Sequence, residues 1–196
     1  TMSLPPFITA ATGMDALTHN IEAYLAKGFS PLCDGIALEG IRLAAQSLER
    51  AVNCPDFESR AKMQMSSLMG ATAFQKGLGI VHSFAHPLSS LLDMHHGLAN
   101  AIMLPWGMEF NAPVCEEKFK TLAQIVGLKD HSSENFIDWI RQLNKKIGLP
   151  STLSSQGAHK NHLHLLAALA LKDPCHGSNP KVVTGDDFNR YYEKAI

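Results

Sequence analysis

The sequence predicts an all-α protein, and three observations support that prediction. Apolar residues recur at three- and four-residue spacing along almost the whole chain, as expected when one face of a helix is buried. No segment shows the sustained alternation of apolar and polar residues that is typical of a half-buried strand. Clusters of Gly, Pro, Asn and Asp separate the periodic stretches and act as helix boundaries. We therefore expect a multi-helix bundle of about eight helices.

Four helices are predicted in the first half of the chain. The segment Thr-Met-Ser-Leu-Pro-Pro at residues 1–6 is expected to be a linker that leads into the first of them. Gly77 and Gly79 interrupt the chain before the fourth helix, and Pro87 should kink or end it. The four helices are expected at about residues 12–26, 34–52, 59–74 and 80–86.

The second half begins with an apolar segment, residues 97–110, that is expected to be buried. Ser133 is the expected N-cap of one later helix, and Thr184 is the expected cap of the last. Residues 173–180, Asp-Pro-Cys-His-Gly-Ser-Asn-Pro, are expected to form a loop. The helices of this half are expected at about residues 115–126, 134–147, 160–171 and 186–194.

Length and composition favour one domain covering residues 1–196, because 45% of the residues are hydrophobic and can form one sizeable core. The net charge is -1 and the charges are well mixed, so we expect no nucleic-acid partner and no membrane association. Four widely spaced cysteines without a CxxC pair favour a reducing, cytoplasmic setting. No glycine-rich phosphate loop follows a strand, so no nucleotide site is visible.

Four ionisable residues occur in two pairs at a spacing that a helix places on one face, and a further histidine follows the second pair. Asp15 and His19 stand four residues apart in the first predicted helix, so both side chains project from the same face. His82 and His86 repeat this spacing, and His96 follows shortly after them. Three imidazoles and one carboxylate suit a divalent transition metal such as Fe²⁺ or Zn²⁺, and suit Mg²⁺ or Ca²⁺ poorly. Such a site could hold a substrate oxygen on a Lewis acid.

The spacing alone leaves simpler interpretations open. One Asp/His pair on a helix usually forms a solvated face or a side-chain hydrogen bond rather than a pair of ligands. Two pairs together with His96, in a segment otherwise rich in apolar and small residues, are harder to explain in this way because buried histidines need partners. The other histidines, among them His159 and His162, are expected at the surface.

At these same residues the chain resembles the iron-containing (group III) alcohol dehydrogenases. The resemblance rests on residues 9–24, Thr-Ala-Ala-Thr-Gly-Met-Asp-Ala-Leu-Thr-His-Asn-Ile-Glu-Ala-Tyr, and on residues 77–88, Gly-Leu-Gly-Ile-Val-His-Ser-Phe-Ala-His-Pro-Leu. It continues through residues 96–105, His-Gly-Leu-Ala-Asn-Ala-Ile-Met-Leu-Pro, and through Asp-Pro-Cys and Asn-Pro in the loop at 173–180. The motifs are long and specific, and together they cover the C-terminal half of the family's fold.

The resemblance implies roles for particular residues. Those that match the family's four metal ligands are Asp15, His19, His82 and His96. His86 matches a histidine that lines the active site, close to nicotinamide and substrate, without binding the metal, and it could relay a proton. His95 could in principle replace its neighbour as a ligand, but the spacing and the following glycine favour His96.

The resemblance also implies a function and a missing partner. We expect the helical, metal-binding half of an alcohol dehydrogenase that uses Fe²⁺ or Zn²⁺ and acts on a small alcohol or aldehyde. In the family, NAD(P) binds mainly to an N-terminal α/β domain, so the isolated chain is expected to lack activity and to self-associate as a homo-oligomer. The alternatives are a non-enzymatic helical metal-binding protein and a fragment of a zinc enzyme related to glycerol dehydrogenase and dehydroquinate synthase.

Overall fold

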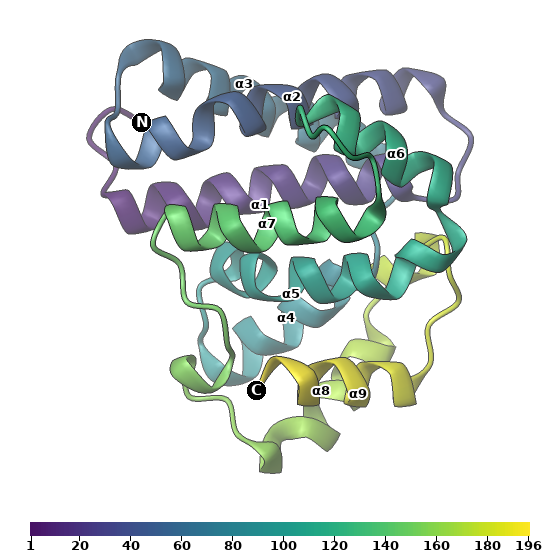
Figure 1. Ribbon diagram of the computed structural model, residues 1–196. Helices are drawn as coiled ribbons and strands as arrows, with labels where there is room; N and C mark the ends of the chain where they lie inside the picture. Colours follow the sequence, from purple (N-terminus) through teal and green to yellow (C-terminus); the bar gives the residue numbers. More distant parts are fainter.

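Helices account for all the regular structure of the protein, as the sequence predicts. The computed structural model describes residues 1–196 and contains no β-strand (Figure 1). The α-helices are α1 (Pro6–Leu25), α2 (Pro31–Asn53), α3 (Phe57–Ala73), α4 (Ile80–Leu92), α5 (His96–Asn111), α6 (Glu116–Ile125), α7 (Ser133–Lys146), α8 (Leu163–Lys172) and α9 (Gly185–Ala195). The segment at 97–110, expected only to be apolar and buried, is therefore most of a helix.

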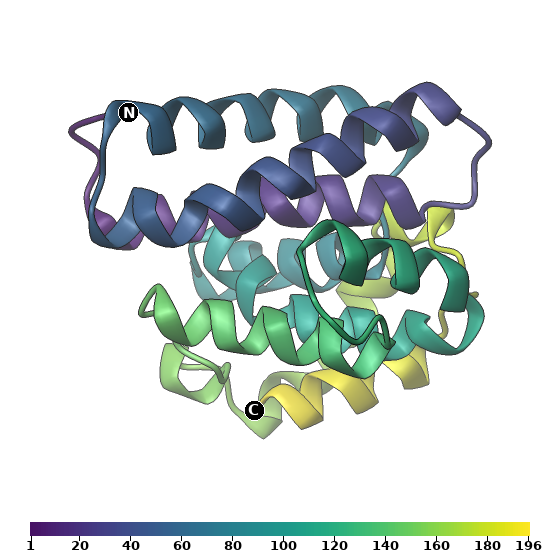
Figure 2. The same ribbon diagram turned by 45° about the horizontal axis from the view of Figure 1, so that its top comes forward.

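Helix α1 is the central element of the fold. Helices α2 and α3 pack on one side of it, and α5 packs on the other side with α4 beside it (Figures 1 and 2). Helices α8 and α9 pack against each other, and α8 also packs against α4. Helix α7 packs against both α5 and α6. Because α1 has neighbours on both sides, fourteen of its residues are buried, and polar side chains on it need partners from other helices.

Helix α1 begins at Pro6 rather than near Thr12, so the expected linker is shorter than predicted. Pro6 occupies the first turn, where its fixed φ is compatible with a helix and its missing N–H costs nothing. Thr9 and Thr12 donate their hydroxyl hydrogens to the carbonyls of Pro5 and Ile8, at 3.0 and 2.7 Å. Because these hydroxyls find acceptors within the first turns of the helix, the threonines are compatible with helix there although they do not follow the apolar pattern. The helix can therefore begin before residue 12.

Helix α4 passes through Pro87, so of the two alternatives expected there, a kink or an end, the end at His86 is wrong. The helix continues to Leu92 and is ended by Asp93, whose φ of 52° is left-handed. Proline removes only one backbone hydrogen bond, and here the surrounding core holds the helix together: Phe84, Ala85, Pro87 and Leu88 are all buried. The continuation places His86 in the middle of a helix, where its position is fixed.

Close packing brings α1, α4 and α5 together. A Cβ at Gly97 would lie 2.2 Å from the carbonyl oxygen of Ala11, so only glycine permits this approach of α5 to α1. On the other side of α4, Phe84 makes edge contacts with Phe188 and Tyr192, and the Tyr192 hydroxyl donates to the Phe84 carbonyl at 2.7 Å. Helix α4 is thus held between α5 and α9.

The remaining boundaries follow local capping. Thr184 forms the expected cap of α9, reciprocated by Asp187. Helix α7 is capped by Ser132 rather than Ser133, one residue earlier than predicted. Helix α8 begins at Leu163 after a short 3₁₀ turn, not at residue 160. No helix is long and apolar enough to cross a membrane.

Candidate metal centre

Three helices bring the four proposed ligands together. Asp15 lies at the centre of the group: its Oδ1 is 3.8 Å from His19 Nδ1, 3.8 Å from His82 Nε2 and 3.4 Å from His96 Nε2. Helix α1 supplies Asp15 and His19, α4 supplies His82, and α5 supplies His96 as its first residue. The pairwise spacing seen in the sequence therefore becomes a single cluster through packing between helices.

The imidazole rings form a continuous group. The His82 ring centroid lies 4.5 Å from that of His19 and 5.5 Å from that of His96. The His86 ring stacks on His96 with centroids 5.3 Å apart and planes 15° apart. His86 thus stands at the edge of the cluster, and its side chain is 43% exposed against 1% for that of His82. His95 is exposed, whereas the Nε2 of His96 lies 3.4 Å from Asp15 Oδ1, which favours His96 as the ligand.

Asn100, which the sequence did not single out, occupies the middle of the cluster. Its Nδ2 lies 2.7 Å from Asp15 Oδ1, 3.1 Å from His96 Nε2 and 3.4 Å from His82 Nε2. Its own Oδ1 is buried without a hydrogen-bond partner. One carboxylate oxygen and two imidazole nitrogens therefore converge on one amide nitrogen that has only two hydrogens to give. When both imidazole nitrogens present lone pairs, this excess of acceptors is an arrangement that a cation satisfies.

The separations agree with this interpretation. A tetrahedral transition metal with bonds of about 2.1 Å holds neighbouring ligand atoms roughly 3.4 Å apart. The distances around Asp15 Oδ1, 3.4–3.8 Å, differ from this by only a few tenths of an ångström. The donor set of imidazoles and one carboxylate also fits a divalent transition metal. The ligating atoms of Asp15, His19 and His82 all lie within 4.8 Å of one another, and His96 joins them through its 3.4 Å approach to Asp15. These residues therefore fit a divalent transition metal, with Asp15 as their shared neighbour.

The electrostatic environment keeps ligand imidazoles neutral. Burial, with the neighbouring His82, lowers the pKa of His19 to about 4, although Asp15 opposes the shift. Burial also lowers the pKa of His96, again against the influence of Asp15. A metal ligand must present a free lone pair, so imidazoles that stay unprotonated at neutral pH are ready to bind.

His82 is oriented by Glu22, a second residue that the sequence analysis missed. Its Nδ1 lies 2.7 Å from Glu22 Oε2, and both side chains are 1% exposed. Glu22 stands on the same helix as His19, three residues further on, and this spacing in an apolar stretch was the available signal. The partners of Glu22 belong to α4, however, and the sequence alone does not show that α4 packs next to Glu22.

His86 has a separate hydrogen-bond system. Its Nδ1 lies 2.6 Å from Asp173 Oδ2, while Asp173 Oδ1 accepts from the Ser83 hydroxyl at 2.8 Å and from the Cys175 N–H at 2.9 Å. Burial, with the negative charge of Asp173, raises the pKa of the Cys175 thiol to about 12. Cys175 is therefore a protonated thiol beside this network, and the carboxylate of Asp173 serves to orient His86.

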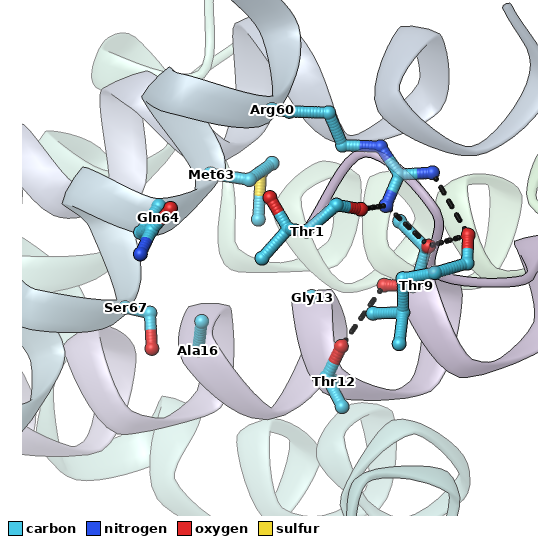
Figure 3. A pocket seen from close by; sticks show the side chains of 10 residues that line it. Thr1, Thr9, Thr12, Gly13, Ala16, Arg60, Met63, Gln64 and Ser67 are labelled. Carbon is cyan, nitrogen blue, oxygen red and sulfur yellow. Dashed lines mark hydrogen bonds between the residues drawn. The ribbon is translucent and has the colours of Figure 1, made fainter. Parts of the chain in front are cut away.

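A half-open pocket with no histidine in its lining lies apart from the imidazoles. It lies between α1, α3 and the N-terminal residues, and it contains the guanidinium of the buried Arg60 (Figure 3). Arg60 donates to the carbonyls of Thr1 and Leu4 and to the Thr9 hydroxyl, at 2.9, 3.1 and 2.7 Å. The arginine therefore fastens the N-terminal segment to α1 and α3, and the cavity is not part of the candidate centre.

Comparisons with known proteins agree with the helical fold. Residues 9–196 match the family described as "Fe-containing alcohol dehydrogenase family, C-terminal". The chain is 37% identical to the 4-hydroxybutyrate dehydrogenase of Cupriavidus necator and 36% identical to the NADPH-dependent butanol dehydrogenase of Clostridium saccharobutylicum. These alignments cover 100% and 97% of this chain but 53% and 51% of the relatives. The chain thus spans about half the length of these curated relatives.

The same relation holds for solved structures. The fold superimposes on a crystal structure of 1,3-propanediol oxidoreductase with a TM-score of 0.97 and 36% sequence identity. The match covers 100% of this chain and 53% of that chain. The helical architecture described above is therefore one that occurs as part of a larger chain.

Proposed function

Because the chain belongs to the iron-containing alcohol dehydrogenase family, we propose that it forms the metal-binding catalytic part of an NAD(P)-dependent alcohol dehydrogenase. The observation that carries the proposal is the convergence of three imidazole-bearing helices on one carboxylate oxygen. The residues proposed to hold the metal are Asp15, His19, His82 and His96. The metal is Fe²⁺ or Zn²⁺, both of which accept this donor set.

Each of the chain's own groups has a separate task in the proposed reaction. The bound metal supplies Lewis-acid stabilisation of negative charge on the substrate oxygen. The four ligands hold that charge centre at the junction of α1, α4 and α5, where burial makes electrostatic effects strong. His86 is proposed to move the proton, because its ring lies at the exposed edge of the cluster and Asp173 fixes its orientation.

The proposed substrate is a small primary alcohol or the corresponding aldehyde. The relatives described above are named for 4-hydroxybutyrate, butanol and 1,3-propanediol, each of which carries a primary hydroxyl group on a short carbon chain. The redox chemistry would be supplied by NAD(P), since the relatives' names include an NADPH-dependent enzyme. No glycine-rich phosphate loop occurs in these residues, so the cofactor is proposed to bind mainly to a separate nucleotide-binding domain.

The test is elemental analysis of the purified chain after anaerobic addition of Fe²⁺ or Zn²⁺ and removal of excess metal. We expect roughly one metal ion per chain, because the four ligands form one site. The His82→Ala/His96→Ala variant should lose that metal, and a His159→Ala/His162→Ala variant, altered at two histidines outside the centre, should keep it. Metal retained by the first variant at the wild-type level would refute the proposed ligand set.

A second test concerns activity. Without a nucleotide-binding domain, the nicotinamide has no fixed position relative to the metal, and the advantage of proximity is lost. We therefore expect the 196-residue chain alone to reduce aldehydes with NADPH or NADH at a negligible rate. Robust turnover by this chain would show that it binds the cofactor by itself.

A further inference from the structure

We propose that Glu22 is a positioning residue that holds His82 in the Nδ1–H tautomer and thereby presents its Nε2 lone pair to the metal. The inference rests on the proposed function, since it concerns how one ligand of that centre is made ready. Glu22 touches neither the substrate nor the proposed metal; it acts through the imidazole of His82.

Glu22 is a buried carboxylate with a full set of donors from α4. Its Oε1 accepts from the Val81 N–H at 2.6 Å, and its Oε2 accepts from the N–H groups of Gly79 and His82 at 3.1 and 3.3 Å. These amides belong to the first turn of α4, where N–H groups have no partner within the helix. A negative charge at this end is also favoured by the helix dipole.

The fourth donor is the His82 side chain. An ionised carboxylate only accepts hydrogen bonds, so the 2.7 Å contact to Glu22 Oε2 requires the proton on His82 Nδ1. A neutral imidazole with a proton on Nδ1 has its lone pair on Nε2. That nitrogen faces Asp15 Oδ1 at 3.8 Å and Asn100 Nδ2 at 3.4 Å. The carboxylate thus directs the lone pair into the cluster, and the opposite tautomer would place an N–H there.

The backbone around Glu22 is adapted to this contact. Gly79, the N-cap of α4, leaves no room for a side chain: a Cβ would lie 2.7 Å from Glu22 Oε1 and 2.8 Å from Asn179 Oδ1. Asn179 accepts from the next amide, that of Ile80, at 3.2 Å. Two side chains therefore cap the start of α4, but of these only Glu22 bonds the imidazole of His82. This difference provides a matched control.

The first experiment measures the tautomer directly. In the wild-type chain labelled with ¹⁵N at histidine and freed of metal, two-dimensional NMR should show His82 with a protonated Nδ1 and an unprotonated Nε2 at neutral pH. A protonated Nε2 and unprotonated Nδ1 would overturn the proposal without any substitution. This measurement does not depend on whether a variant folds.

The second experiment compares Glu22→Gln with Asn179→Ala. Glu22→Gln replaces one of the two capping oxygens and Asn179→Ala removes its only one, so each should lower stability. Only Glu22→Gln replaces an acceptor next to the His82 ring, so only it should redistribute the tautomers. Displacement of a chromophoric chelator by Zn²⁺ should show a Zn²⁺ affinity about 10- to 100-fold weaker for Glu22→Gln. The Asn179→Ala variant should bind within about threefold of wild type.

The outcomes separate this proposal from the proposed function. A wild-type chain that binds neither Zn²⁺ nor Fe²⁺ would refute the proposed function, and with it the purpose assigned to Glu22. Normal wild-type binding with an unchanged Zn²⁺ affinity in Glu22→Gln would refute the positioning role alone. An equal loss in Asn179→Ala would also refute it, because general loosening of α4 would then be sufficient. If Glu22→Gln does not fold, Glu22→Asp replaces it, because the shorter side chain keeps the charge but draws the carboxylate away from His82 Nδ1. Unchanged Zn²⁺ affinity in Glu22→Asp would then refute the positioning role.

Discussion

At the scale of single residues, the centre combines acceptors that would repel one another without a cation. Asp15 Oδ1 and the Nε2 atoms of His82 and His96 all lie within 3.4 Å of the same amide nitrogen of Asn100. Burial disfavours a proton as the neutralising charge, because it lowers the pKa of both His19 and His96. In the metal-free chain, the lone pairs of the cluster are therefore neutralised more readily by a metal ion than by a proton. Acid should then lower the stability of this metal-free chain.

Acid should destabilise the metal-free chain through His19. The pKa of His19 is about 4 in the folded chain and near the ordinary histidine value of 6.5 in the unfolded chain. Between these values the unfolded chain binds more protons, so the free energy of unfolding falls as the pH falls from about 6.5 to 4. The pKa difference limits the loss to roughly 3 kcal/mol. Urea unfolding in the presence of a chelator at several pH values would measure it.

The His19→Gln variant is the control for this pH dependence. Glutamine cannot take up the proton, so the difference in unfolding free energy between wild type and variant should shrink or change sign as the pH falls through this window. A difference that stays constant from pH 7 to pH 4 would show that His19 does not titrate as proposed. The comparison cancels the contributions of other groups that both chains share.

His86 should affect the reaction without affecting the metal. Its Nδ1 is engaged by Asp173 and its ring lies at the edge of the cluster, so His86→Ala should leave the metal content unchanged. In a protein that also contains the nucleotide-binding part, kcat should fall by about 10² or more, the usual contribution of a general acid or base. Loss of metal together with activity would instead identify His86 as a ligand.

At the scale of the elements, helix identity could be predicted from the sequence more readily than helix ends. The apolar periodicity that predicts α1 to α3 arises from burial of one face, which is a local pattern. The end of α4 is predicted too early, at Pro87. The helix continues past this proline because Phe84 packs against α9, and such tertiary support is not visible in the sequence. Similarly, Thr9 and Thr12 bond within α1, so its first turns carry little apolar signal.

In the candidate site, too, local spacing could be predicted from the sequence and contacts between helices could not. The spacing of Asp15 with His19, and of His82 with His86, places each pair on one helix face, and this could be predicted from the sequence. Spacing cannot show that separate helices meet, and that expectation came from the family resemblance. Glu22, Asn100 and Asp173 were not predicted, because each acts on a residue from a different helix. Their partners become neighbours only when α1, α4, α5 and the loop at 173–180 pack.

The contact between α1 and α5 can be tested at Gly97. In Gly97→Ala the new Cβ would meet the Ala11 carbonyl at 2.2 Å, and backbone atoms cannot move aside cheaply. We expect destabilisation of about 1–3 kcal/mol from this overpacking. We also expect weaker metal binding, since α1 and α5 both supply ligands and would be forced apart. Thermal unfolding and Zn²⁺ titration would measure the two effects.

Gly35→Ala provides the matched control on α2. Nothing lies within 4 Å of a Cβ at Gly35, and its backbone is helical. Alanine there should raise stability by up to about 1 kcal/mol, because it restricts the unfolded chain. Its metal affinity should equal that of wild type. Equal behaviour of the two variants would contradict the close approach of α5 to α1.

At the scale of the whole molecule, the candidate centre lies between two layers of helices and takes residues from both. Helix α1 belongs with α2 and α3, while α4 and α5 belong with the helices on the opposite side (Figure 2). Ligands come from both groups, since Asp15 and His19 lie on α1 and the other two lie on α4 and α5. A metal ion bound there would connect elements that otherwise meet through van der Waals packing and a few hydrogen bonds.

Metal binding should therefore stabilise the entire chain, not only the site. A ligand that binds only the folded state at 100 times its Kd adds about 2.7 kcal/mol to the free energy of unfolding. For a chain of this size, that corresponds to a rise in Tm of roughly 5–11 °C. Calorimetry with and without Zn²⁺ would measure the rise, and His82→Ala/His96→Ala should abolish it. If hydrogen exchange then slowed only in residues next to the ligands, while α2 and α9 were unaffected, the centre would be a local clamp and not a connection between the layers.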